Sequence, residues 1–261
     1  MTQPHAQSGS RIRLEWGPVG AALLGPAATA SVVVDVLSFT TTLSVAADRG
    51  VTVHPSAWAD DGAERLAASV GATLAVARRA AGPGRVSLSP GTVRAAADLD
   101  RLVLPSPNGS SISATLAAVG CAVLGASLRN RLAVAVHLHD VLSRDESASV
   151  ALIPAGERWP DGSLRPAVED LWGAGGVIAA LEDRGHTSGS EEVRAAATAY
   201  RLIEERVGAA LAACSSGQEL IDAGYAGDVT IAAELDSSRS VPRLVGGAFV
   251  SPAGGTESSK A

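Results

Sequence analysis

The chain has 261 residues, of which 46% are hydrophobic and 3% aromatic, and its formal net charge is −6. An acidic chain without a long lysine and arginine run lacks the basic face that a general nucleic-acid binder needs, so we expect no nucleic-acid partner. The two cysteines form no Cys-x-x-Cys pair and Gly25-Pro26 interrupts the only apolar stretch near the N-terminus, which favours a reducing, cytoplasmic location and argues against a signal peptide or membrane span.

Short β-branched runs alternate with alanine-rich helical stretches along the chain. We expect strands at residues 11–16, 31–37, 51–54, 73–77, 101–104, 120–124, 150–154 and 228–232. Apolar residues that recur every three or four positions predict helices at residues 39–48, 60–70, 110–119, 129–142, 166–182 and 191–213. This alternation predicts an α/β protein with three α/β/α layers around a largely buried sheet, as one unit or as two lobes sharing a cleft.

Residues 11–253 are expected to form one functional domain, which is long enough to bury its own core. Residues 1–10 and 254–261 are polar and rich in small side chains, so we expect both ends to be mobile tails. The sequence does not determine the oligomeric state, and a homo-oligomer is compatible with it.

Asp35 ends the apolar strand at residues 31–35 and precedes several hydroxyl groups at the start of the next helix. Ligands bind at such strand ends because the following helix presents free N–H groups to the same crevice. Ser38, Thr40 and Thr41 are therefore candidates for an oxyanion cradle. Helix capping is the alternative role for the hydroxyl groups. The acid at the end of an apolar strand, in contrast, favours a ligand-binding site.

Residues 105–111 have a similar layout, with an Asn108-Gly109 turn between a strand and a helix. Consecutive N–H groups beside the Ser110 hydroxyl could form an anion-binding nest. An ordinary tight turn with Ser110 as N-cap explains the same residues equally well.

The segment at residues 153–176 carries four acids and two arginines around a strand end, a turn at residues 160–163 and a helix that Pro166 opens. Carboxylates at such a place can hold a hard cation, and arginines suit phosphate or sulfonate oxygens. An i,i+4 salt bridge between Arg165 and Glu169 is the simpler explanation for that pair. The candidate ligands of metal or substrate are Glu157, Arg158, Arg165, Glu169 and Asp170.

Two further segments leave alternatives open. Asn130 follows another strand, where its amide could contact substrate or simply start a helix. Cys214-Ser-Ser-Gly217 is similar to the opening of a cysteine phosphatase loop, but Leu220 stands where that loop needs an arginine. The cysteine is therefore interpreted as structural.

Taken together and in order, the segments at residues 33–37, 106–110, 153–158, 165–170 and 214–220 resemble the 2-phosphosulpholactate phosphatases of coenzyme M biosynthesis. The resemblance extends over about residues 14–249. It implies an α/β fold and a magnesium-dependent hydrolase that converts 2-phosphosulpholactate to sulpholactate and phosphate.

Two positions depart from the family pattern and bear on the substrate. Ser38 stands where the family often has an arginine, and Ala75-Val-Ala-Arg-Arg79 replaces an Ala-Gly-Glu-Arg segment. An anionic group of the substrate has therefore lost one arginine partner, unless Arg78 or Arg79 substitutes for it.

The hypothesis is that Mg²⁺, held by Asp35 with Glu157, Glu169 or Asp170, bridges the phosphoryl oxygens of a small acidic substrate. Asp35, Glu157 and Asp170 are the candidate catalytic residues, and the attacking group stays open between water and a carboxylate. A non-catalytic binding protein for a small phosphorylated or sulfonated acid is the alternative. The expected substrate contacts are Thr40, Thr41, Asn108, Gly109, Ser110, Asn130, Arg158 and Arg165.

Overall fold

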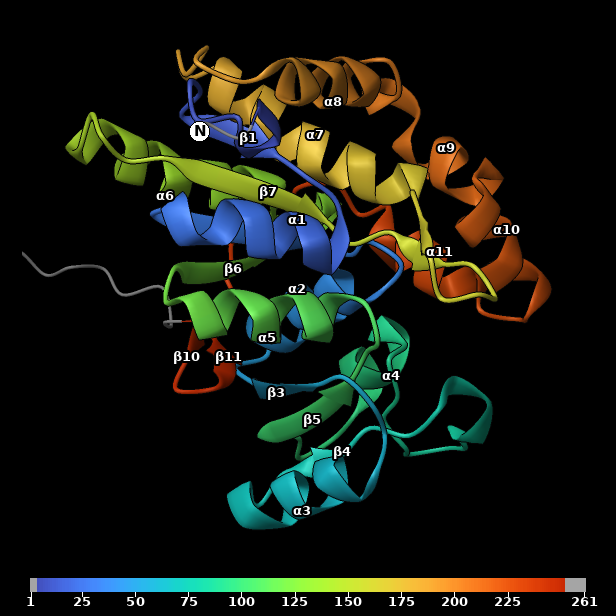
Figure 1. The fold of residues 1–261 in the computed structure, drawn as a ribbon. Helices are drawn as coiled ribbons and strands as arrows, with labels where there is room; N and C mark the ends of the chain where they lie inside the picture. The colour runs from blue at the N-terminus through green and yellow to red at the C-terminus, as the bar shows by residue number, and fades with distance from the viewer. Residues whose placement is uncertain (1–3, 252–261) are drawn as a thin grey trace, which may run out of the picture.

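The computed structural model describes residues 4–251 (Figure 1). Within these residues, one sheet has the strand order β1-β7-β2-β6-β10-β11-β3-β5-β4, and β8 and β9 form a separate hairpin. The strands are β1 (Ile12–Leu14), β2 (Ala30–Val34), β3 (Thr52–Ser56), β4 (Thr73–Leu74), β5 (Arg101–Pro105), β6 (Ala122–Ala126), β7 (Val150–Pro154), β8 (Glu157–Arg158), β9 (Leu164–Arg165), β10 (Arg243–Val245) and β11 (Ala248–Val250).

Helices cover both faces of the sheet, which confirms the predicted three-layer α/β fold. Along β2, Val32 and Val34 face one core and Val33 faces the other, as the two-residue period of a strand requires. Figure 1 shows α7 and α8 on one side of β7 and α1 on the other. The helices are α1 (Gly17–Leu24), α2 (Phe39–Asp48), α3 (Asp61–Val70), α4 (Pro90–Ala95), α5 (Gly109–Val119), α6 (Arg131–Arg144), α7 (Val168–Glu182), α8 (Glu191–Arg201), α9 (Val207–Ala213), α10 (Ser215–Asp222) and α11 (Ala226–Ala232).

The sheet consists of two parallel halves joined by the β10–β11 hairpin. Strands β1, β7, β2 and β6 form one half and β3, β5 and β4 the other. The hairpin pairs antiparallel with β6 and with β3 at its two sides. The two halves are therefore parts of one continuous sheet.

Several expectations about elements need correction. Residues 228–232 are helical, because a short β-branched run has only a weak strand preference and here the segment packs as α11 against α4 and α10. The helix expected at residues 191–213 is divided into α8 and α9 by a 3₁₀ turn at Glu204–Arg206. The β10–β11 hairpin was missed, although Gly246-Gly247 with positive φ at both residues is a typical hairpin turn.

The described N-terminal segment contacts β1. Gln7 donates a hydrogen bond to the carbonyl of Leu14 and accepts one from its N–H group. Residues 4–10 are therefore held against β1, while the tail expected at residues 254–261 lies outside the described residues. No helix between residues 4 and 251 has the length and apolar character to cross a bilayer.

Candidate active site

The candidate site lies at the carboxyl ends of β2 and β7. These strands are parallel neighbours, so the residues that follow them lie at the same edge of the sheet. Asp35 follows β2 directly, and Glu157 follows β7 at the start of β8. The helix α7 packs on both strands and begins with Glu169 and Asp170 at the same edge. The structure therefore gathers the four predicted acids at one edge of the sheet.

Asp35 joins the starts of two helices. Its Oδ1 accepts a hydrogen bond from Phe39 N at 3.0 Å, and its Oδ2 accepts one from Gly109 N at 3.0 Å. Burial raises the pKa of Asp35, while these two N–H groups and the charge of Arg78 oppose the rise. The carboxylate thus fixes the beginnings of α2 and α5 beside the end of β2.

Asp170 has an equivalent role at the start of α7. Its Oδ1 accepts a hydrogen bond from Val36 N at 2.7 Å, and its Oδ2 accepts one from Gly156 N at 2.8 Å. Burial raises the pKa of Asp170 well above its ordinary value, and the charge of Asp35 adds to the rise. Asp170 therefore connects the loops that follow β2 and β7.

Of the four acids at this edge of the sheet, Glu157 is the one that lines the open cavity. Asn108 Nδ2 donates a hydrogen bond to its Oε2 at 2.9 Å, and Arg165 lies opposite it in the β8–β9 register. Burial, followed by the charge of Asp35, raises the pKa of Glu157 to about 7. At neutral pH this carboxyl can therefore donate or accept a proton.

Glu169 is buried beside the Cys214 thiol. Burial, followed by the charge of Glu169, raises the pKa of Cys214 to about 11, so the thiol stays protonated at neutral pH. Cys214 is also the N-cap of α10 and accepts a hydrogen bond from Gly217 N at 3.4 Å. These properties fit a neutral structural thiol rather than a nucleophile.

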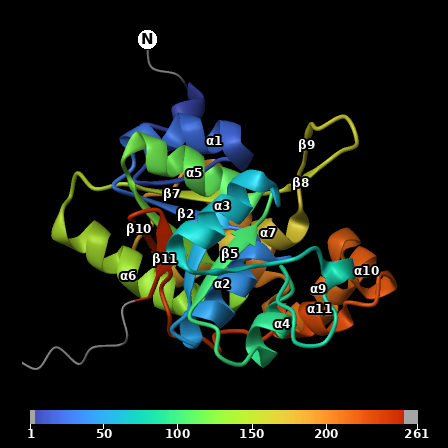
Figure 2. The same ribbon diagram turned by 90° about the horizontal axis from the view of Figure 1, so that it is seen from below.

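Arginines face Glu157 across a cavity of about 590 Å³. Arg165 Nη2 donates to Ser216 Oγ at 3.4 Å, and its guanidinium lies 5.7 Å from the ring centroid of Trp159. Arg158 also lines the cavity, and both arginines belong to the β8–β9 hairpin. Figure 2 shows this hairpin extending from the body of the molecule.

Arg78 is the third arginine of this cavity, and it is one of the two residues that the sequence offered as a substitute for the missing arginine. Its Nη2 donates to Ser38 Oγ at 2.5 Å, and its Nε pairs with Asp228 Oδ2 at 3.2 Å. Its guanidinium also lies 5.8 Å from the ring centroid of Tyr225. The pair Arg78-Arg79 after the fourth strand is visible in the sequence. Nothing in the sequence indicates that Asp228 or Tyr225 contacts Arg78.

The hydroxyl groups expected to cradle an oxyanion are used within the protein. Thr40 Oγ1 donates to the carbonyl of Asp35 at 2.8 Å, and Thr41 Oγ1 donates to that of Val36 at 2.8 Å. Ser110 Oγ donates to the carbonyl of Leu104 at 3.3 Å. These three residues stabilise the loops of the site and are not among the residues that line its cavity.

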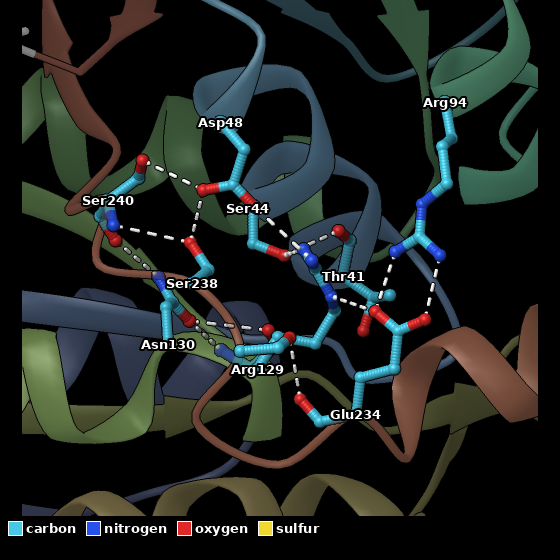
Figure 3. Close-up of polar contacts among 11 residues, drawn as sticks. Thr41, Ser44, Asp48, Arg94, Arg129, Asn130, Glu234, Ser238 and Ser240 are labelled. Carbon is cyan, nitrogen blue, oxygen red and sulfur yellow. Dashed lines mark hydrogen bonds and ion pairs between the residues drawn. The ribbon is translucent and has the colours of Figure 1, made fainter.

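Two other expected contacts also bind the protein itself. The Gly109 N–H of the proposed anion nest binds Asp35, which is the protein's own anion. Asn130 accepts from Ser127 N at 2.8 Å and donates to the carbonyls of Gly125 and Ser240. Figure 3 shows Asn130 among the polar contacts around Arg129 and Ser240, so its amide starts a helix and has no place in the cavity.

The expected ion pair between Arg165 and Glu169 is absent from the ion pairs of the described residues. Arg165 faces Glu157 across the hairpin instead. As the described side chains lie, no three of the His, Cys, Asp and Glu residues are arranged to hold a metal ion. Magnesium commonly takes only one or two carboxylates together with waters and phosphate oxygens. The acids therefore fit this ion only in such a mixed ligand set.

The model of a family described as 2-phosphosulpholactate phosphatase matches residues 24–247. This match includes all four acids and the three arginines of the cavity. No curated protein matches the chain.

Proposed function

The chain belongs to the 2-phosphosulpholactate phosphatase family and is a phosphoric monoester hydrolase, and we propose that it hydrolyses 2-phosphosulpholactate with the help of Mg²⁺. The observation that carries this proposal is the position of Glu157, which lies in one cavity with Arg78, Arg158 and Arg165. Guanidinium groups bind phosphate and sulfonate oxygens, and a carboxylate in the same cavity is a suitable ligand for Mg²⁺.

In the proposed reaction, the oxygen of a water molecule forms a bond to phosphorus while the ester P–O bond breaks. The departing alcohol oxygen gains a proton and the attacking water loses one, and both protons are exchanged with solvent. The products are sulpholactate and inorganic phosphate. The arginines hold the phosphoryl oxygens and stabilise the negative charge on them during the transfer.

Glu157 and Glu169 are the residues that we propose to hold Mg²⁺. Asp35 and Asp170 already accept two backbone hydrogen bonds each, whereas Glu157 Oε2 accepts one from Asn108. The charges of the acids also raise one another's pKa values, beyond the larger effect of burial, and a divalent cation would relieve this repulsion. When bound, the ion would supply Lewis acidity to the phosphoryl oxygens.

Phosphate release from the purified protein tests the proposal. The panel contains 2-phosphosulpholactate and other phosphorylated two- and three-carbon acids, each with Mg²⁺ or with EDTA. We expect hydrolysis with Mg²⁺ and its loss with EDTA. Unchanged rates in EDTA would refute the metal, and saturable binding of 2-phosphosulpholactate without phosphate release would favour the binding-protein alternative.

The variant Asp170→Asn tests the site itself. An amide can accept only one of the hydrogen bonds from Val36 N and Gly156 N, so the two loops separate and phosphate release falls by about 10²-fold or more. Asp140→Asn is the matched control, because Asp140 is exposed on α6 and forms only an i,i+4 ion pair there. Equal activity of the two variants would contradict the proposed site.

A further inference from the structure

Asp228 is a buried acid of α11 that does not line the cavity of Glu157. Its Oδ2 pairs with Arg78 Nε at 3.2 Å, and its Oδ1 accepts a hydrogen bond from the hydroxyl group of Ser89. A buried carboxylate is costly unless such partners compensate its charge. Asp228 therefore connects two segments of the β3–β5–β4 half of the sheet with the C-terminal helices.

A role in starting α11 is the simpler explanation for this acid, because carboxylates stabilise the N-terminal ends of helices. Among the described residues, however, no backbone N–H group donates a hydrogen bond to the side chain of Asp228. Ser89 departs from its local role in the same way. It is the N-cap of α4, but its hydroxyl group makes no capping bond and donates to Asp228 instead. Both side chains thus serve a contact between segments that are 139 positions apart in the sequence.

Asp228 determines the direction in which the guanidinium group of Arg78 points. A guanidinium group is planar and carries five N–H bonds. Asp228 accepts the one at Nε, and Ser38 accepts one of the two at Nη2. The remaining N–H bonds include both at Nη1, which has no acceptor among the described residues. Because Arg78 lines the cavity of Glu157, these bonds are available to the oxygens of a bound anion.

We infer that Asp228 is a positioning residue for the hydrolysis, which holds Arg78 in the orientation in which its free N–H bonds meet the phosphoryl oxygens. The inference rests on the proposed function. Asp228 acts only through Arg78, since its own side chain is 5% exposed and lies outside the cavity. Without the ion pair, Arg78 keeps only Ser38 and the Tyr225 ring as contacts, and its long side chain loses more rotamer freedom when phosphate binds.

The sign of the effect on anion binding separates positioning from simple charge. The carboxylate of Asp228 is negative, so its removal would by charge alone strengthen the binding of a phosphate near Arg78. Positioning predicts the opposite. In Asp228→Ala we expect the dissociation constant of inorganic phosphate, measured by calorimetry, to rise about tenfold, and kcat/KM for 2-phosphosulpholactate to fall by about the same factor. Unchanged or tighter binding of phosphate would overturn the inference.

A second background shows whether Asp228 acts through Arg78. In Arg78→Ala there is no guanidinium group to position, so the addition of Asp228→Ala should weaken phosphate binding by less than about twofold. A loss that is the same with and without Arg78 would overturn the inference, because a general effect on folding does not depend on that side chain. Asp228→Asn keeps the volume and one acceptor oxygen, so its phosphate binding should be intermediate. It takes the place of Asp228→Ala in both backgrounds if that variant does not fold.

Asp222→Ala is the matched control, since Asp222 is an exposed acid at the end of α10 that does not line the cavity. Its phosphate binding and kcat/KM should equal those of the unmodified protein. Hydrolysis by the unmodified protein without coupling between Asp228 and Arg78 would overturn the inference alone. No phosphate release from 2-phosphosulpholactate or from the other acids of the panel would instead overturn the proposed function, and the inference with it.

Discussion

The raised pKa of Glu157 predicts a change in stability with pH that one substitution removes. Burial and the charge of Asp35 raise this pKa from 4.5 to about 7. The folded state therefore binds the proton of Glu157 more tightly than the unfolded state does. This contribution to the free energy of unfolding is complete below about pH 4.5 and is lost as the pH rises through 7.

The size of the effect follows from the two pKa values. A difference of one pH unit corresponds to about 1.4 kcal/mol, so a rise from 4.5 to about 7 corresponds to about 3 kcal/mol. The variant Glu157→Gln stays neutral at every pH, and its side-chain oxygen can still accept the hydrogen bond from Asn108. The stability of this variant relative to the unmodified protein should therefore increase by about 3 kcal/mol between pH 4.5 and pH 8.

Urea unfolding from pH 4.5 to pH 8.5 in EDTA measures this difference. Glu64→Gln serves as control, because Glu64 is exposed on α3, and its curve should stay parallel to that of the unmodified protein. Parallel curves for Glu157→Gln would refute the reasoning that Glu157 titrates near neutral pH. With Mg²⁺ at about 100 times its Kd, the unmodified protein should gain about 2.7 kcal/mol at pH 8, and Glu157→Gln should gain less.

Two further substitutions test the scaffold and the arginines. In Gly175→Ala the new Cβ would overlap the carbonyl oxygen of Ala196, whereas in Gly208→Ala the nearest atom is 3.8 Å away. Thermal unfolding should therefore show a loss of about 1–3 kcal/mol in the free energy of unfolding for Gly175→Ala only. Arg78→Lys keeps the charge but cannot bond to both Ser38 and Asp228 in the same planar geometry, so kcat/KM should fall by about tenfold. The variant Arg85→Lys, at an exposed position, should retain the kcat/KM of the unmodified protein. Equal kcat/KM values for Arg78→Lys and Arg85→Lys would contradict the role of Arg78.

The sequence was sufficient to predict the layers and to place the acids at strand ends and helix starts, because both depend on local patterns. A buried strand that ends in an acid, as at Asp35, and an acidic helix start, as at Asp170, are visible in the chain itself. The partners of polar groups could not be predicted in the same way. The Gly109 N–H group was available to an anion, but only the folded chain shows that this anion is Asp35, which lies 74 residues away in sequence.

The position of Arg78 gives the departures from the family pattern a common physical explanation. Ser38 occupies a place where the resemblance leads to an arginine, and its hydroxyl accepts a hydrogen bond from Arg78 at 2.5 Å. The guanidinium arrives from the segment after β4 and is close enough to Asp35 to oppose the rise of its pKa.

An arginine at position 38 or at position 78 would thus bring positive charge to the same edge of the sheet. Of these two residues, only Arg78 lines the cavity that contains Glu157. An arginine from the segment after β4 therefore keeps a guanidinium group in this cavity although position 38 is a serine.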